Sequence, residues 1–405
     1  MELKLGYKLT ETGVIPEEWM SRGLLSAVCI ANGQVDPQKD PFRSMVLIAP
    51  DHIESGTGKL LAKQTAAEQH AISGKYVFDA GDIIYSKIRP YLKKAILVDF
   101  AGLCSADMYP LRPAADVDGG YILPVLLGYR FTKYAESVSV RSGMPKINRA
   151  ELADFVVAVP PLYEQHSIAA ALSDVDALLN GLDRLIAKKR ALKQATMQRL
   201  LTGQTRLPGF HEEWEVKRLG DLAQLNRQNV VPAREPGQLF VHFSLPAFDA
   251  GRGAPTELGS AIGSNKFRVP PNAVLVSKLN PRIPRIWAPT SIPRNAVAST
   301  EWLVLTPREG VDRRFLFTLC SSPGVCRRLE LAATGTTGSH QRISPGIALD
   351  IRVATPSDGE EQTAIAAVLS DMDAELSALQ ARRDKTHDLK QAMMQELLTG
   401  RTRLV

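Results

Sequence analysis

The segment that decides the fold of this chain occurs twice. Residues 164–203 read EQHSIAAALSDVDALLNGLDRLIAKKRALKQATMQRLLTG, and residues 361–400 read EQTAIAAVLSDMDAELSALQARRDKTHDLKQAMMQELLTG. The two copies align without a gap, 197 residues apart, and more than half of their positions are identical. An agreement of this length does not arise by chance, so the chain contains an internal duplication.

Each copy has the apolar spacing of a long helix, with intervals of three and four residues that are typical of a coiled coil. The predicted seam consists of Ile168, Leu172, Val175, Leu179, Leu182 and Ile186 in the first copy, and of Ile365, Leu369, Met372, Leu376 and Leu379 in the second. After an interruption, the seam is expected to resume at Leu192, Met197 and Leu200 in the first copy, and at Leu389, Met393 and Leu397 in the second. Gly203 and Gly400 are the expected helix ends. Two such helices in one chain are expected to pack as an antiparallel pair.

The repeat extends more faintly into the rest of the chain. GVIPEEW (13–19) resembles PGFHEEW (208–214), DIIYSKIRP (82–90) resembles AVLVSKLNP (273–281), and MPKIN (144–148) resembles HQRIS (340–344). Short β-branched runs broken by Gly and Pro predict strands and turns in these parts. We therefore expect an α+β (mixed α/β) fold with an internal pseudo-twofold repeat, in which two globules are linked by two long helices packed as an antiparallel coiled coil. The expected domains are a first globule (1–160), a central helix (161–203), a second globule (204–356) and a C-terminal helix (357–405).

Composition narrows the class of protein. Of the 405 residues, 44% are hydrophobic and 23% are charged, which are ordinary values for globular domains. No stretch approaches the roughly 18 uncharged apolar residues of a membrane span, so we expect a cytoplasmic protein without a membrane partner. The four cysteines lack the spacing of zinc ligands, and no metal site is expected. The net charge of +6 weakly favours a polyanionic partner.

No complete catalytic motif is present in the sequence. Glu215 and Lys217 match only the end of a metal-nuclease pattern, and the paired motifs of an adenine methyltransferase are missing. A binding protein is therefore favoured over an enzyme. Two other hypotheses stay open, namely a catalytic nuclease and a coiled-coil scaffold whose globules bind protein or RNA.

Basic residues gather in the same two places of each half. The candidate DNA-binding residues are Lys87, Arg89, Lys93, Lys94 and Lys146 in the first half, and Lys278, Arg282, Arg285, His340, Gln341 and Arg342 in the second. Cations on loops suit phosphate contacts, and Arg or Asn there suits base edges. A solvated strand edge is the alternative explanation. Recurrence of the SK-x-x-P element in both halves favours a function.

The duplicated module, the repeated helix ending in LLTG, the GVIPEEW motif and the EQ-x-x-IA motif after a Pro-rich turn resemble the specificity subunit of type I restriction–modification systems. The most specific parts are PPLYEQHSIAAALSDVDALL and LKQATMQRLLTG with their second copies. The resemblance implies two target-recognition domains, each reading one half of a split double-stranded DNA target. It also implies that the helices set the spacer between the half-sites and dock the methyltransferase subunits.

The same resemblance implies which partners carry out the chemistry. The chain itself would be non-catalytic and would bind no cofactor. Two methyltransferase (modification) subunits would use S-adenosylmethionine for DNA methylation at adenine N6. Restriction subunits with an ATP-driven motor would join in the full complex and use ATP and Mg. Because the two modules share little sequence beyond the scaffold positions, we expect an asymmetric target.

Overall fold

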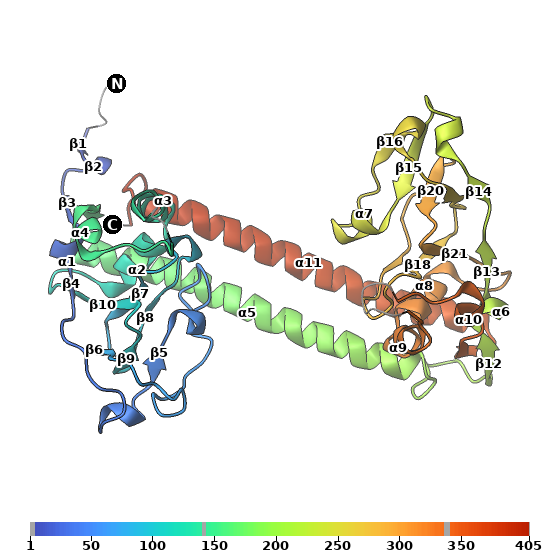
Figure 1. The fold of residues 1–405 in the computed structure, drawn as a ribbon, viewed down its shortest axis with the longest axis horizontal. Coiled ribbons are helices and arrows are strands. Elements are labelled where there is room, and N and C mark those ends of the chain that lie inside the picture. Colours follow the sequence, from blue (N-terminus) through green and yellow to red (C-terminus); the bar gives the residue numbers. More distant parts are fainter. Residues whose placement is uncertain (1–4, 140–142, 336–340, 405) are drawn as a thin grey trace. The chain divides into compact units, whose positions relative to one another are not determined.

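The computed structural model describes residues 5–139, 143–335 and 341–404, and the chain divides into two compact units (Figure 1). Unit 1 comprises Met1–Asp183 and Arg382–Val405, and unit 2 comprises Arg184–Ala381. Both units contain a globular part and a portion of each long helix. None of the described helices combines the length and apolar content that crossing a membrane requires.

Unit 1 is built on small, mostly antiparallel sheets with helices packed against them, and β5 pairs with β9 in parallel. Its strands are β1 (Tyr7–Thr10), β2 (Gly13–Pro16), β3 (Met20–Gly23), β4 (Val28–Ile30), β5 (Leu47–Ile48), β6 (Tyr76–Phe78), β7 (Ile83–Ser86), β8 (Ala95–Leu97), β9 (Gly102–Cys104), β10 (Met108–Pro113) and β11 (Val156–Val159). Its short helices are α1 (Leu24–Ala27), α2 (Gly119–Leu127), α3 (Tyr129–Val138) and α4 (Arg149–Asp154). The central sheet has the order β4-β10-β7-β8.

Unit 2 repeats this plan with a larger second sheet. Its strands are β12 (Trp214–Arg218), β13 (Ala223–Asn226), β14 (Asn229–Val230), β15 (Leu239–Phe243), β16 (Thr256–Leu258), β17 (Lys266–Arg268), β18 (Val274–Ser277), β19 (Ile286–Trp287), β20 (Ala296–Ser299), β21 (Trp302–Pro307) and β22 (Arg352–Pro356). Its short helices are α6 (Leu219–Leu222), α7 (Leu245–Asp249), α8 (Arg313–Ser321), α9 (Pro323–Leu331) and α10 (Pro345–Leu349). The sheet β13-β21-β18-β19 has the same strand order as the central sheet of unit 1.

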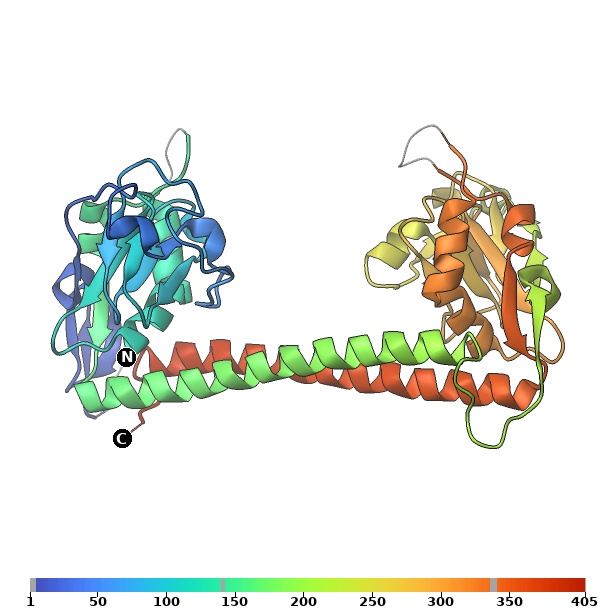
Figure 2. The ribbon, with the colours of Figure 1, turned by 90° about the horizontal axis from the view of Figure 1, so that it is seen from below.

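One long helix follows the last strand of each globular part. Helix α5 spans Leu162–Leu200 and helix α11 spans Gly359–Leu397, so both contain 39 residues. They run antiparallel, side by side (Figures 1 and 2). Beyond their ends, Gly203 and Gly400 have φ of 71° and 69°, a conformation that glycine adopts without strain. The helices stop where their sequences predict.

The predicted apolar seam joins the core cluster of each unit and continues between the two clusters. Ile168 and Leu172 of α5 belong to the same core cluster as Met394 and Leu397 of α11 in unit 1. In unit 2 the equivalent cluster joins Ile365 and Leu369 with Met197 and Leu200. Of the other predicted seam residues, Leu182, Ile186 and Leu376 are buried, and Val175, Leu179, Met372 and Leu379 are half-buried.

Where the seam is expected to resume, Met197, Leu200, Met393 and Leu397 do pack in or against the core clusters. The prediction is wrong only for Leu192 and Leu389. These leucines are 51% and 55% exposed. Lysines one position further along take the inward-facing place: Lys390 binds Asp176 at 2.6 Å in unit 1, and Lys193 binds Asp373 in unit 2. These four residues are equivalent in the repeat, and their charge explains why the apolar pattern falters there.

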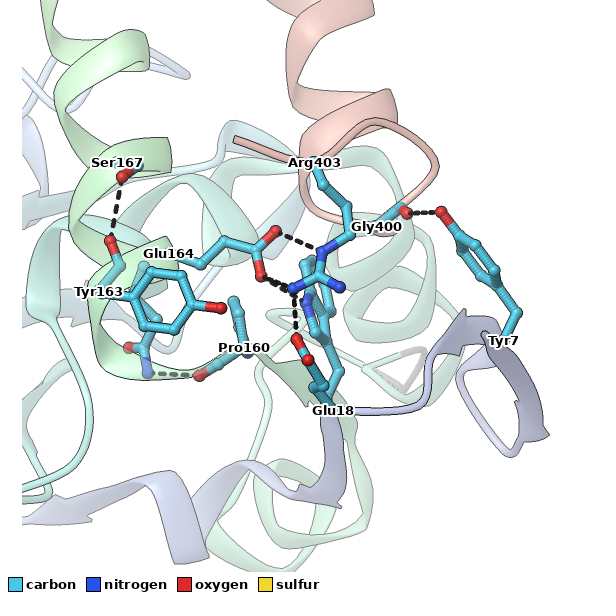
Figure 3. Close-up of polar contacts among 10 residues, drawn as sticks. Tyr7, Glu18, Pro160, Tyr163, Glu164, Ser167, Gly400 and Arg403 are labelled. Carbon is cyan, nitrogen blue, oxygen red and sulfur yellow. Dashed lines mark hydrogen bonds and ion pairs between the residues drawn. The ribbon is translucent and has the colours of Figure 1, made fainter. Parts of the chain in front are cut away.

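A buried glutamate anchors the start of each long helix. In unit 1, Glu164 is 0% exposed and accepts hydrogen bonds from Trp19 Nε1 at 2.9 Å and from Arg403 Nε and Nη2 at 3.0 and 2.8 Å. Arg403 also binds Glu18 at 2.7 Å (Figure 3). Because Arg403 follows α11, this anchor ties the segment after α11 to the start of α5.

Unit 2 contains the same anchor built from equivalent residues. Glu361 is 0% exposed and accepts from Arg206 Nε and Nη2 at 2.6 and 2.7 Å and from Trp214 Nε1 at 3.3 Å. Arg206 and Arg403 stand 197 residues apart, as do the two glutamates. The glutamate that opens both repeat copies therefore has a structural role.

Candidate nucleic-acid interface

In unit 1 the structure brings the two basic segments together. The segment after β7 and the segment before α4 form a short antiparallel pairing at Ile88 and Lys146. Arg89 N–H donates to the Pro145 carbonyl at 2.8 Å, and Ile147 N–H donates to the Lys87 carbonyl at 2.9 Å. We call residues 86–94 and 143–148 the first loop pair.

Unit 2 has the same arrangement at equivalent positions. Asn280 N–H donates to the Gln341 carbonyl at 2.7 Å, and Ile343 N–H donates to the Lys278 carbonyl at 3.1 Å. We call residues 277–285 and 341–344 the second loop pair. Both loop pairs are also tied to their central sheets, since Lys87 N–H donates to Asp107 and Lys278 N–H donates to Glu301, at 3.0 and 2.8 Å. The repeat therefore extends to the hydrogen bonds of these loops.

Both loop pairs contain a residue with left-handed backbone at the same place. Arg89 has φ of 48° and Asn280 has φ of 51°, and each stands immediately before a proline. The residue before a proline is disfavoured in the right-handed helical region. A left-handed non-glycine residue costs on the order of 1–3 kcal/mol and persists only where the surrounding structure holds it. The cross-loop hydrogen bonds of both residues supply that hold.

Several predicted cations are free to meet a ligand. Within the part of the chain that the structure describes, the side chains of Arg89, Lys93, Lys146 and Lys278 form no ion pair. The ammonium of Lys87 lies 5.2 Å from the centre of the Tyr109 ring and has no carboxylate partner there either. The first loop pair thus presents four cations, and none of them is neutralised by a described carboxylate.

Other predicted residues are engaged within their own unit. Lys94 Nζ donates to the Pro50 carbonyl at 2.6 Å. Arg285 binds Asp249 through two hydrogen bonds of 2.8 and 3.0 Å and lowers the pKa of that carboxyl. Arg342 binds Glu301, and this contact raises the pKa of the guanidinium. Gln341 contributes its backbone carbonyl, and His340 lies outside the described residues. Lys94, Arg285 and Arg342 are therefore the weakest candidates for DNA contact.

A recurring pair of buried lysines was not predicted. Lys75 and Lys266 are 7% and 5% exposed, and each donates to the carbonyl and hydroxyl of the serine two residues earlier. Burial lowers the pKa of both ammonium groups. Each stands twelve residues before the lysine of its SK-x-x-P element, so extending the repeat alignment upstream finds them.

The described residues hold no group of three or more His, Cys, Asp or Glu side chains that could bind a metal ion. Burial raises the pKa of the Cys104 and Cys320 thiols to about 12, which disfavours the reactive thiolate. The two loop pairs therefore offer positively charged side chains on a backbone that is held in place by hydrogen bonds.

Part of the chain is similar to known DNA specificity proteins. Residues 51–190 match the family model of the type I restriction modification DNA specificity domain. The type I restriction enzyme EcoDI specificity subunit of Escherichia coli is 34% identical over 202 residues, 49% of this chain and 45% of that subunit. The MjaVIII specificity subunit of Methanocaldococcus jannaschii is 24% identical over 291 residues, 67% of this chain and 68% of that one. The chain spans about half the length of the Escherichia coli subunit and of a second Methanocaldococcus jannaschii relative.

Solved structures share the fold along nearly the whole chain. A chain from a type I restriction–modification system superposes with a TM-score of 0.62 at 22% identity, covering 96% of this chain and 99% of that one. The S subunit of a type I system from M. genitalium gives a TM-score of 0.59 at 13% identity, with 98% of both chains covered. These structures confirm the predicted fold class, and the family model and curated relatives confirm the resemblance to type I specificity subunits.

Proposed function

We propose that this chain, which carries a type I restriction modification DNA specificity domain, recognises a split double-stranded DNA sequence for a type I restriction–modification complex. The observation that carries the proposal is the recurrence of one loop pair, with unneutralised cations on rigid backbone, in both units. Each loop pair contacts one half-site. Lysine and arginine supply phosphate contacts, and side chains held at fixed positions read base edges.

The two half-sites differ in sequence. The loop pairs share their backbone hydrogen bonds but not their side chains: Arg89 and Tyr91 of unit 1 correspond to Asn280 and Arg282 of unit 2. Different side chains on the same backbone read different bases. The target is therefore asymmetric.

The long helices serve two purposes in this proposal. They join the parts that read the half-sites, and so their length sets the tolerated spacer. They also dock two methyltransferase subunits, because the exposed face that bears Leu192 in α5 recurs at Leu389 in α11.

Apolar hollows beside α11 support a docking role for this helix. In unit 1, a groove of about 350 Å³ lies along Ala171, Leu389, Ala392, Met393 and Leu397. A second hollow of about 790 Å³ is lined by α3, β11 and the C-terminal part of α11, and none of its lining residues belongs to the first loop pair. Exposed apolar surface of this kind suits a protein partner. S-adenosylmethionine, ATP and Mg are used by partner subunits, and this chain is non-catalytic.

The proposal is tested by co-expression with the methyltransferase encoded beside it, in a host without DNA methylation, followed by single-molecule mapping of N6-methyladenine. Methylation on both strands of one asymmetric split motif is the expected result. A stable complex that methylates no such motif contradicts the proposal and favours a scaffold that binds protein or RNA. Duplex binding should also weaken steeply with salt, because each neutralised phosphate releases counterions.

A further inference from the structure

In the second loop pair, Asn280 is fixed from several sides. Asn280 is 9% exposed, its N–H donates to Gln341, and its carbonyl accepts from Ile283 N–H at 3.0 Å. Its left-handed backbone is one that asparagine adopts more readily than most residues. The carboxamide therefore has a defined position within the loop.

This carboxamide holds the guanidinium of Arg282. Asn280 Oδ1 accepts from Arg282 Nε at 3.0 Å. Arg282 is otherwise exposed, and no carboxylate among the described residues pairs with it. Since Nε is occupied, the two Nη groups remain as donors at the outer edge of the guanidinium.

A guanidinium held in this way suits a base better than a phosphate. A phosphate accepts from many directions, and unfixed cations such as Lys278 meet it without support. Guanine presents N7 and O6 side by side in the major groove, and they accept two parallel hydrogen bonds from one arginine. Such a contact needs a defined orientation, which Asn280 provides.

Unit 1 lacks this device. The residue equivalent to Asn280 is Arg89, whose side chain is exposed, and the residue equivalent to Arg282 is Tyr91, which is 50% exposed. Tyr91 has no charge to place against guanine. At this equivalent position, the two loop pairs should therefore recognise different bases.

We propose that Arg282 reads a guanine in the half-site bound by unit 2, and that Asn280 is the positioning residue that aims it. This inference rests on the proposed function of the chain. It adds the base that is recognised, the residue that contacts it and the residue that orients this contact.

The test uses the complex of the full chain with its methyltransferase. Arg282→Lys keeps the charge but loses the paired donors. Asn280→Gly permits the left-handed backbone but removes the acceptor, and Asn280→Asp restores an acceptor at the same place. Lys278→Ala is the matched control, a cation of the same loop without a positioning partner. The methylated motif is mapped for each variant, and each complex is titrated with duplexes that carry single base-pair changes.

We expect Arg282→Lys to relax one G·C position of one half-site, lowering its preference by about 5- to 150-fold, while the other positions are unchanged. Asn280→Gly should relax the same position, and Asn280→Asp should recover it. Lys278→Ala should weaken binding to all duplexes alike and leave the motif intact.

The possible failures are distinguishable. If the unaltered complex methylates no split motif, the proposed function itself fails. If it methylates one and Arg282→Lys leaves every position as strict as before, only the guanine contact is refuted. If Arg282→Lys relaxes the motif but Asn280→Gly does not, Arg282 is the reader and Asn280 does not position it. Arg282 is exposed, so its variant decides the first point even where Asn280→Gly fails to assemble.

Discussion

Glu164 shows how much one side chain can depend on the end of the chain. Its buried carboxylate is held by Arg403 and Trp19, and Arg403→Ala leaves it in the core with one donor only. Removing one partner of a buried ion pair costs about 3–5 kcal/mol, because the remaining charge stays desolvated. We expect the free energy of unfolding of unit 1 to fall by about 3 kcal/mol, measured by denaturant titration.

The repeat supplies a matched variant for this prediction. Arg206→Ala removes the equivalent partner of the buried Glu361 and should also destabilise unit 2. Arg401→Ala is the control, since Arg401 pairs with Glu396 at the surface, where ion pairs contribute little. Equal, small effects of all three variants would show that neither anchor stabilises its own unit.

Charge removal at the loop pairs should affect DNA binding but not assembly. Replacing Lys87 and Arg89, or Lys278 and Arg282, with Ala should weaken duplex binding and lower the salt slope by about one for each lost phosphate contact. The double variant of Lys94 and Arg285 should change binding less, because both side chains are engaged within their units. Fluorescence anisotropy at several salt concentrations measures the slopes. Loss of methyltransferase assembly with intact DNA binding would reverse the assigned roles.

The sequence identified the basic segments of both loop pairs because they recur in the two halves. It did not predict that the two segments of each half pair with one another. The hydrogen bonds between Arg89 and Pro145 and between Asn280 and Gln341 join segments far apart in the chain. Whether a lysine is free, as at Lys93, or bound to a carbonyl, as at Lys94, depends on which backbone the fold brings nearby. The sequence around a lysine does not show which distant backbone carbonyl the fold will bring near it. DNA contact by these residues stays a prediction.

The two long helices carry a prediction about spacing. Asp183 of α5 pairs with Arg383 of α11, so the junctions 183–184 and 381–382 lie at the same level of the helix pair. Inserting four residues, slightly more than one turn, at both junctions lengthens each helix by about 6 Å. With base pairs about 3.4 Å apart, the tolerated spacer should grow by one or two base pairs, which methylation mapping detects. An unchanged spacer would show that helix length is not what sets it.

The exposed leucines shared by both helices carry a prediction about stoichiometry. Leu192→Glu and Leu389→Glu should each remove one methyltransferase from the complex, because each places a charge on a docking face. Leu185→Glu is the control, since Leu185 is also exposed but corresponds to Arg382 in the other copy. Native mass spectrometry counts the subunits. Retention of two methyltransferases by both variants would place the docking surface elsewhere.

Sequence predicted the long helices well and the sheets only in outline, for a physical reason. A heptad pattern is a property of one continuous segment, whereas strands such as β5 and β14 contain two residues each and exist only through their partners. The one error in the helices has the same origin. Leu192 fits a seam by spacing, but the adjacent Lys193 is drawn inward by Asp373 of the other helix.

At the scale of the whole molecule, the repeat allows a variant to be designed in which both globular parts are the same. Both globular parts meet their helices through the same elements: the β3–β11 or β12–β22 pair, a buried Glu that accepts from a Trp, and an arginine from the segment that follows the other helix. A chain in which residues 1–160 also replace 204–356 keeps these contacts, provided that the TRL segment (205–207) is retained ahead of the second copy. We expect it to fold and to bind two methyltransferases.

The target of the symmetrised chain follows from the direction of its helices. Within each unit the segments of α5 and α11 run antiparallel, so we expect the two identical readers of this chain to bind inverted half-sites. The methylated motif should therefore become palindromic, with both halves equal to the half-site read by unit 1, and the guanine assigned to Arg282 should disappear. Mapping N6-methyladenine in cells that express this variant shows the outcome directly. A motif that keeps one half-site of the original second type would mean that sequence is read outside the exchanged residues, and a direct repeat would contradict the antiparallel arrangement itself.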